Sequence, residues 1–137
     1  MSHQLTFNRK HKYNHSAQGI TLEVILRHGD LYSHCQAKVD TGAQICLFAR
    51  EIGEDLELDI EAGSPMILET LTGNFIAYGH ELTLDLLETQ FYSTVYFAAE
   101  RGLRRNLLGR EGWLRLIRLA LIDYNEELYL SLYNDPI

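Results

Sequence analysis

A chain of 137 residues, 46% of them hydrophobic, has the length and composition of one domain with a substantial core. Its formal charge of −7 and pI of about 5.3 argue against nucleic-acid binding, which requires clustered Lys and Arg to contact phosphates. The sequence has no run of about 18 apolar residues and no apolar segment near Met1, so neither a membrane span nor an export signal is expected and a cytoplasmic protein is the default.

Residues 1–18 are polar and lack a periodic apolar face, so they are expected to form a flexible N-terminal arm. His11 and His15 have the i, i+4 spacing that can bind a metal ion on a helix, but no further ligands accompany them. No metal and no cofactor is therefore expected. The globular domain is expected to span residues 19–137.

That domain begins with a predicted hairpin that ends in an acid. Apolar residues alternate over residues 20–26 and again over residues 31–39, with a short turn between them. Asp40 follows directly, Thr41 carries a hydroxyl that can donate and accept, and Gly42 permits a tight turn or close approach to a ligand. A carboxylate on a turn held by a strand is a candidate for proton transfer.

The remaining elements are mostly short strands. Residues 49–58 carry apolar side chains four positions apart and predict a short helix, and Trp113 with Leu116 and Ile117 predicts a second one. Further strands are expected at residues 66–68, 75–86, 91–97, 119–124 and 128–133. About seven short strands and two short helices are typical of an all-β barrel or sandwich.

The two cysteines, Cys35 and Cys46, lie on either side of Asp40 without a metal-binding spacing. In a chain without an export signal they are expected to be reduced thiols rather than a disulfide. A cysteine-dependent hydrolase using Cys46 is one alternative function, although an apolar strand favours an inert thiol.

The sequence has no second Asp-Thr-Gly or Asp-Ser-Gly segment that could supply a partner for Asp40. One carboxylate cannot act as both base and acid toward a water, whereas two chains related by a two-fold axis could each supply one. Retroviral-type aspartic proteases work in this way, and Val39-Asp40-Thr41-Gly42-Ala43 resembles their active-site signature. Asn106-Leu107-Leu108-Gly109-Arg110 resembles their second signature, and residues 66–86 lie between the two, where that family carries its flap. Trp113 after the Gly-Arg pair is similar to bacterial single-domain members.

The resemblance, which covers roughly residues 19–133, implies a single-domain retropepsin-like closed β-barrel with a flap hairpin and one short C-terminal helix. It also implies a homodimeric aspartic endopeptidase in which Asp40 and its two-fold mate share a proton and activate a water. Thr41 would brace the two loops across the axis, Gly42 would offer its carbonyl to the substrate backbone, and Ala43 would line the pocket.

Two further groups of residues take roles from the same resemblance. The flap would cover a peptide bound in extended conformation. The expected flap residues are Leu71, Thr72, Gly73, Asn74 and Phe75. The expected structural support under the catalytic turn is Leu107, Leu108, Gly109 and Arg110.

The sequence departs from the family pattern in two places. Retroviral members commonly have an acid after the active-site signature, where it pairs with the arginine of the second signature, but this chain has Gln44. Arg110 therefore needs another acceptor, such as a backbone carbonyl or a nearby Glu. The flap tip also carries a single glycine, Gly73, where retroviral flaps carry several.

The main alternative is a catalytically silent retropepsin-like module for dimerisation or peptide binding. In either case a homodimer is expected. The final hairpin, residues 119–133, offers apolar strand faces and a possible edge for pairing between chains.

Overall fold

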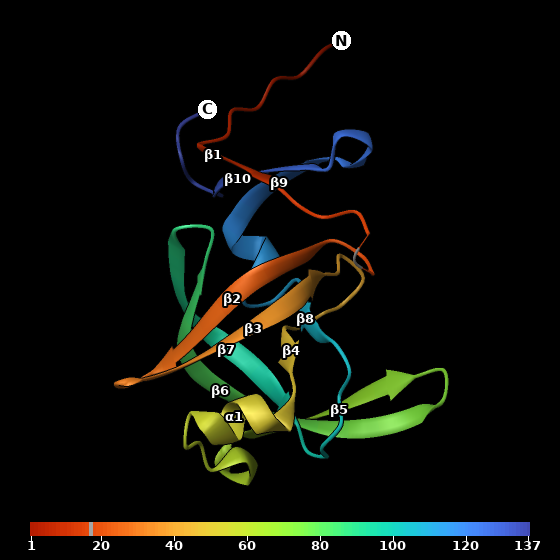
Figure 1. Ribbon diagram of the computed structural model, residues 1–137, viewed down its shortest axis with the longest axis vertical. Coiled ribbons are helices and arrows are strands. Elements are labelled where there is room, and N and C mark those ends of the chain that lie inside the picture. The colour runs from red at the N-terminus through yellow and green to blue at the C-terminus, as the bar shows by residue number, and fades with distance from the viewer. Residues whose placement is uncertain (17) are drawn as a thin grey trace.

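The computed structural model describes residues 1–16 and 18–137, and it consists mainly of β-strands (Figure 1). The strands are β1 (Arg9–Lys12), β2 (Thr21–His28), β3 (Leu31–Val39), β4 (Leu47–Phe48), β5 (Ser64–Thr70), β6 (Gly73–Leu86), β7 (Thr89–Ala98), β8 (Asn106–Leu108), β9 (Ile117–Ile122) and β10 (Glu127–Leu132). The helical segments are the α-helix α1 (Arg50–Asp55) and the 3-10 turns η1 (Ile60–Ala62), η2 (Leu114–Leu116) and η3 (Asp123–Asn125).

Six strands close into a barrel. Neighbouring strands pair in the order β2, β3, β8, β4, β7 and β6, and β2 closes the ring by pairing with β6 between Ile25–Arg27 and Thr83–Asp85. β5 continues the sheet beyond β6, and the β5–β6 hairpin projects from the barrel (Figure 1). The expected all-β class and closed barrel are confirmed.

The barrel interior follows from alternation along the strands. In β2, Leu22, Val24 and Leu26 are at most 1% exposed, whereas Glu23 between them is exposed. Successive side chains of a strand point to opposite faces, so alternate apolar residues line one continuous core. Each fully buried side chain of this size contributes about 1.5–3 kcal/mol.

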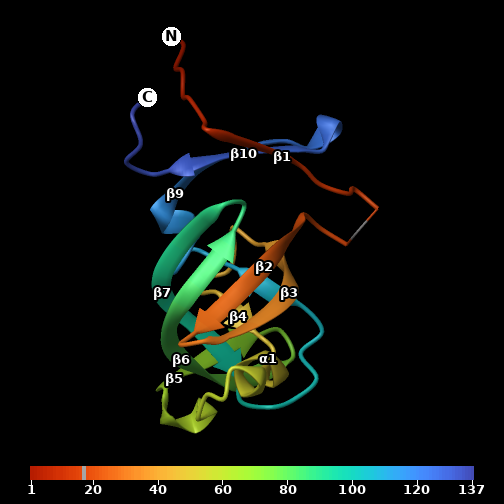
Figure 2. The same ribbon diagram turned by 60° about the vertical axis from the view of Figure 1, so that its left-hand side comes forward.

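A second, three-stranded sheet with the order β1, β10, β9 caps one end of the barrel, near both termini (Figure 2). Here the structure differs from the expected loose arm, because residues 9–12 pair with β10 from Arg9↔Leu130 to Lys12↔Glu127. The basic sequence of β1 has no apolar alternation, so this strand depends on the backbone edge that β10 supplies.

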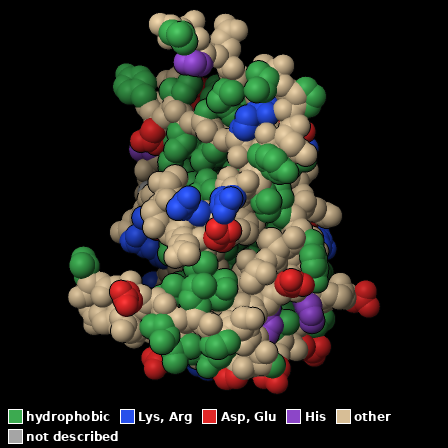
Figure 3. Space-filling model, turned by 180° about the vertical axis from the view of Figure 1, so that it is seen from behind, with side chains coloured by type: hydrophobic (Ala, Val, Ile, Leu, Met, Phe, Trp, Pro, Cys, Tyr) green, Lys and Arg blue, Asp and Glu red, His purple; other side chains and the backbone are tan. Residues whose placement is uncertain are grey.

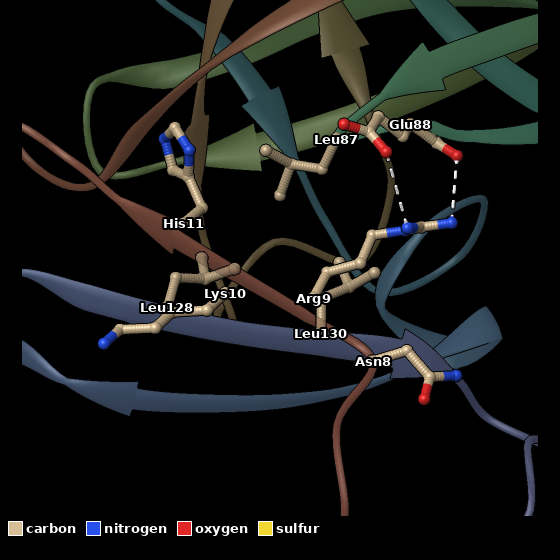
Figure 4. Close-up of a pocket in the computed structure, with 8 residues that line it drawn as sticks. All are labelled: Asn8, Arg9, Lys10, His11, Leu87, Glu88, Leu128 and Leu130. Atoms are coloured by element: carbon tan, nitrogen blue, oxygen red, sulfur yellow. Dashed lines mark hydrogen bonds and ion pairs between the residues drawn. The ribbon is translucent and has the colours of Figure 1, made fainter.

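Arg9 also fastens this sheet to the barrel. It projects from β1 toward the β6–β7 turn on the same side as His11 (Figure 4). Its Nη2 donates to the backbone oxygen of Glu88 at 3.2 Å, and its Nη1 lies 3.6 Å from the Glu88 carboxylate. These contacts border a cavity of about 310 Å³ that has no residue in common with the surroundings of Asp40.

Two local expectations differ in detail. The short helix expected around Trp113 is the single 3-10 turn η2, because Trp113 itself has a non-helical backbone (φ −146°, ψ −67°) and turns its ring into the core. At the projecting hairpin, Leu71 and Thr72 form the turn, and Gly73 at φ 134° already begins β6.

Candidate active site

Asp40 lies at the carboxyl end of β3, where the barrel fixes its backbone. Val39 pairs with Leu108 of the parallel strand β8, and the Asp40 amide donates to the Leu108 carbonyl at 3.0 Å. β8 itself lies between β3 and β4. The loop that connects β3 to β4 therefore passes over the end of β8. Because both flanking strands pair with β8, the two ends of this loop are held in place.

The Asp40 side chain is held by its own turn. The Gly42 amide donates to Oδ1 at 2.9 Å, and the Ala43 amide donates to the Asp40 carbonyl at 3.2 Å. Within residues 1–16 and 18–137, Oδ2 has no hydrogen-bond partner. The side chain is half-buried, while Thr41 and Gly42 are exposed. One carboxylate oxygen is thus positioned and the other is available to a ligand.

The residues after β8 clamp this turn from below. The Arg110 amide donates to the Ala43 carbonyl at 2.9 Å, and the Glu111 amide donates to the Gln44 carbonyl at 2.8 Å. A Cβ on Gly109 would lie 2.0 Å from the Ile45 carbonyl oxygen, so only glycine permits this approach. The two sequence signatures, which are far apart in the chain, therefore form one unit.

The side chains of Leu107 and Leu108 divide the expected supporting role. Leu108 is completely buried in the core beneath the turn. Leu107 is half-buried and lines the cavity above it.

A cavity of about 620 Å³ opens between the Asp40 turn and the β5–β6 hairpin. We call it the groove. It is lined by Asp40, residues 42–45, Leu47, residues 66–70, Phe75 and Leu107. This size and a largely apolar lining with a few polar groups are typical of ligand sites. The structure thus brings the predicted acid, its turn and the predicted flap together.

The flap contributes differently from the sequence expectation. Leu71, Thr72, Gly73 and Asn74 are exposed at the hairpin tip, and of the five expected flap residues Phe75 lines the groove. Residues 66–70 of β5 supply the remaining flap wall; the sequence interpretation placed them in the flap hairpin but did not name them as substrate-binding residues. The sequence carried no signal of this role, because Met66, Ile67 and Leu68 form a continuous apolar run; the structure shows that Met66 and Leu68 are half-buried between exposed neighbours.

Among the described residues, the Arg110 guanidinium has no acid partner. Both Arg110 and Gln44 are exposed, and no hydrogen bond or ion pair of the Arg110 side chain occurs within the described part of the chain. Arg110 supports the site through its backbone amide instead.

Neither cysteine has the character of a nucleophile. Both are free thiols, as expected. Burial raises the pKa of Cys46 to about 11 and that of Cys35 to about 12, so both remain protonated near neutral pH. Cys46 lies beneath the turn, with Sγ 3.4 Å from the Gly109 amide. A cysteine-dependent hydrolase is therefore disfavoured, because catalysis requires an accessible thiolate.

The described residues contain no cluster of three or more His, Cys, Asp or Glu side chains arranged to hold a metal ion. His15 instead places Nδ1 2.8 Å from Glu126. None of the helices in residues 1–16 and 18–137 has the length and apolarity needed to cross a membrane.

Two solved aspartic proteases have a similar fold. A retropepsin-like aspartic protease from Rickettsia conorii matches with a TM-score of 0.60 over 89% of this chain and 87% of that chain, at 16% sequence identity. This chain has a retropepsin-like fold. The same fold is found in EIAV protease, solved with the inhibitor HBY-793, at a TM-score of 0.52 over 71% of this chain and 86% of that chain, again at 16% identity.

No family model matches the sequence. No curated protein matches it either. The comparisons thus show the fold of this chain, and Asp40 lies in the groove of that fold.

Proposed function

We propose that this protein is an aspartic endopeptidase whose active site forms when two copies of the chain each contribute one Asp40. The observation that carries this proposal is the Asp40 carboxylate in the groove beneath the flap, which is anchored through Oδ1 and has no partner at Oδ2 among the described residues. A second carboxylate, Glu69, also lines the groove, but it lies exposed on the flap strand rather than on the rigid turn. A hydrolytic pair needs two acids in equivalent, fixed positions, which a two-fold axis beside Asp40 supplies.

The chemistry follows from placing two carboxyl groups side by side. Like charges a few ångströms apart cannot both ionise, so the pair holds one proton and titrates as a unit. The ionised Asp40 takes a proton from water while the protonated one polarises the peptide carbonyl, and no covalent intermediate forms. The flap hairpin covers the extended peptide and excludes bulk water.

Two free strand edges of the three-stranded sheet are available to the second copy. β1 offers four basic residues, Arg9–Lys12, so pairing of this edge with its own copy would place like charges opposite one another. β9 offers Leu121 and Ile122, which are 40% and 45% exposed. The space-filling view shows apolar side chains exposed at the end of the molecule that carries this sheet (Figure 3).

Charge and apolarity therefore favour β9 as the edge that pairs across the two-fold axis. η2 connects β9 to the residues that hold the Asp40 turn. The Leu114 amide of η2 donates to the Gly109 carbonyl at 3.0 Å. Pairing at this edge would thus act close to the catalytic turn.

The catalytic test compares Asp40→Asn with Asp30→Asn, a control at an exposed position in the turn between β2 and β3 and outside the groove. Asparagine retains an Oδ1 acceptor for the Gly42 amide, so the first variant is expected to keep its fold and melting temperature. Cleavage of an unstructured protein between about pH 4 and 7 should fall about 10³-fold in Asp40→Asn and change by less than about threefold in Asp30→Asn. Unchanged cleavage by Asp40→Asn would refute the mechanism. A folded, dimeric wild-type protein without activity would identify a silent peptide-binding module.

The dimer test compares Leu121→Lys with Lys12→Gln, a change at an exposed position of β1, by sedimentation. A charge on the β9 edge should weaken self-association at least about tenfold and reduce activity at low protein concentration, with recovery at high concentration. The β1 variant should behave as the wild type. A monomeric wild type that is fully active would contradict the shared site.

A further inference from the structure

A second hollow adjoins the groove and shares part of its wall. This hollow, of about 430 Å³, is lined on one side by Gln44, Ile45 and Met66, which also line the groove. A peptide that lies in the groove therefore has a path past the catalytic turn into this second space. We call it the tyrosine hollow, after Tyr92 and Tyr96 in its wall.

The wall contributed by β7 is rich in hydroxyl groups and aromatic faces. Tyr92, Thr94 and Tyr96 alternate along β7 and so share one face of the strand. Tyr92 is 72% exposed and Tyr96 is half-buried, so both rings are accessible from solvent. Ser93, which also lines the hollow, is already engaged, since its hydroxyl donates to the Gly112 carbonyl at 3.0 Å.

The charged group in the lining is Glu111. Its Oε1 accepts from Arg115 Nη1 at 3.0 Å, while Oε2 has no hydrogen-bond partner in the described part of the chain. Arg110 and Arg115 are close in sequence, but neither lines the hollow. The Glu111–Arg115 pair is more than half exposed on both sides, and such pairs are weak and easily rearranged.

A carboxylate with a free oxygen beside two tyrosine rings suits a cation. The faces of aromatic rings attract ammonium and guanidinium groups, and the carboxylate accepts their hydrogen bonds. We propose that the tyrosine hollow is a specificity subsite that receives a Lys or Arg side chain of the peptide substrate, outside the two residues that flank the cleaved bond. This inference rests on the proposed endopeptidase function, since it places a peptide in the groove.

Two-fold symmetry makes the inference more specific. Each copy of the chain brings one tyrosine hollow, so the assembled site has one at either end of the groove. The preferred substrates therefore carry a basic residue on both sides of the cleaved bond, at similar distances from it.

Binding to the Asp40→Asn protein tests this without depending on cleavage. The probes are fluorescent peptides with one apolar centre and Lys, norleucine or Glu placed in turn at each outer position, measured by anisotropy. Lys should improve Kd about threefold to tenfold over norleucine at one outer position on each side, and Glu should weaken it. Adding Glu111→Gln should abolish the Lys advantage, and adding Arg115→Gln should increase it.

The subsite is refuted if Glu peptides bind more tightly than Lys peptides, if the Lys advantage persists in Glu111→Gln, or if no peptide binds. Failure of the two proposals is distinguishable. Lys-dependent binding without any cleavage by the wild type would overturn the endopeptidase and keep the subsite. Cleavage that is indifferent to basic residues would overturn the subsite and keep the endopeptidase.

Discussion

Replacing Gly109 with alanine should destabilise the junction between the two signatures more than a single methyl group normally does. The added Cβ would lie 2.0 Å from the Ile45 carbonyl oxygen and 2.7 Å from that of Ala43. Both obstacles are backbone atoms, so relief requires the turn to move by about 1.5 Å to reach an ordinary contact distance.

That movement disturbs two hydrogen bonds, from the Arg110 amide to Ala43 at 2.9 Å and from the Glu111 amide to Gln44 at 2.8 Å. Overpacking costs about 1–3 kcal/mol, and each lost bond about 1 kcal/mol. The expected loss in the free energy of unfolding is therefore about 3–5 kcal/mol. Because the damage lies beneath Asp40, activity should fall even where the variant remains folded.

Urea unfolding of Gly109→Ala and wild type at one protein concentration measures this loss, since self-association would otherwise shift the midpoints. Gly29→Asn is the matched control. Gly29 has φ +60°, a conformation that asparagine tolerates, and a Cβ there meets nothing within 4 Å. The control should change stability by less than about 1 kcal/mol. A Gly109→Ala protein within about 1 kcal/mol of wild type would refute the close packing of the two signatures.

Three further predictions concern residues around the site and core. The hydrogen bond from Arg50 to Glu61, at 2.5 Å, holds the pKa of the Glu61 carboxyl below its usual 4.5. The pair therefore stabilises the folded state above pH 4.5, and this stabilisation is lost as pH falls through the lowered pKa. Glu61→Gln should accordingly lower the urea midpoint more near pH 7 than near pH 3; equal effects at both would contradict the pairing. Cys46, with its pKa raised to about 11 by burial, should react with a thiol reagent near pH 8 only after unfolding, and rapid labelling of the native protein would show an open site. Trp113 is fully buried, and its indole N–H finds no acceptor among the described residues. Trp113→Phe should therefore lower the free energy of unfolding by about 1–2 kcal/mol, and Trp113→Ala by about 3–5 kcal/mol. Equal losses of the two variants in chemical denaturation would contradict this packing.

Several features were predictable because their causes are local. The alternation in residues 20–26 and 31–39 predicts two strands, which the structure has as β2 and β3. Turn chemistry at Asp40 and Gly42 similarly predicts the carboxylate at the end of a strand. A side-chain period of two and the conformational preferences of a few residues are sufficient for such predictions.

Other features depended on partners distant in the chain. Residues 9–12 became a strand because β10 offers a backbone edge, although their own sequence indicates none. Residues 66–70 likewise line the groove only because the flap hairpin lies opposite the Asp40 turn in the folded chain. The tyrosine hollow is lined by residues of β7 and of the loop after β8, and no local sequence pattern predicts that these two segments meet.

The sequence by itself determined that an acid would stand on a turn after a strand, with a Leu-Leu-Gly-Arg segment far downstream. Tertiary structure alone decided that these two segments meet, because β8 inserts between β3 and β4 and brings Gly109 against the Ile45 carbonyl. Backbone pairing between distant strands is set by the whole barrel closing around its core, whereas the conformation of a turn is set by the few residues within it.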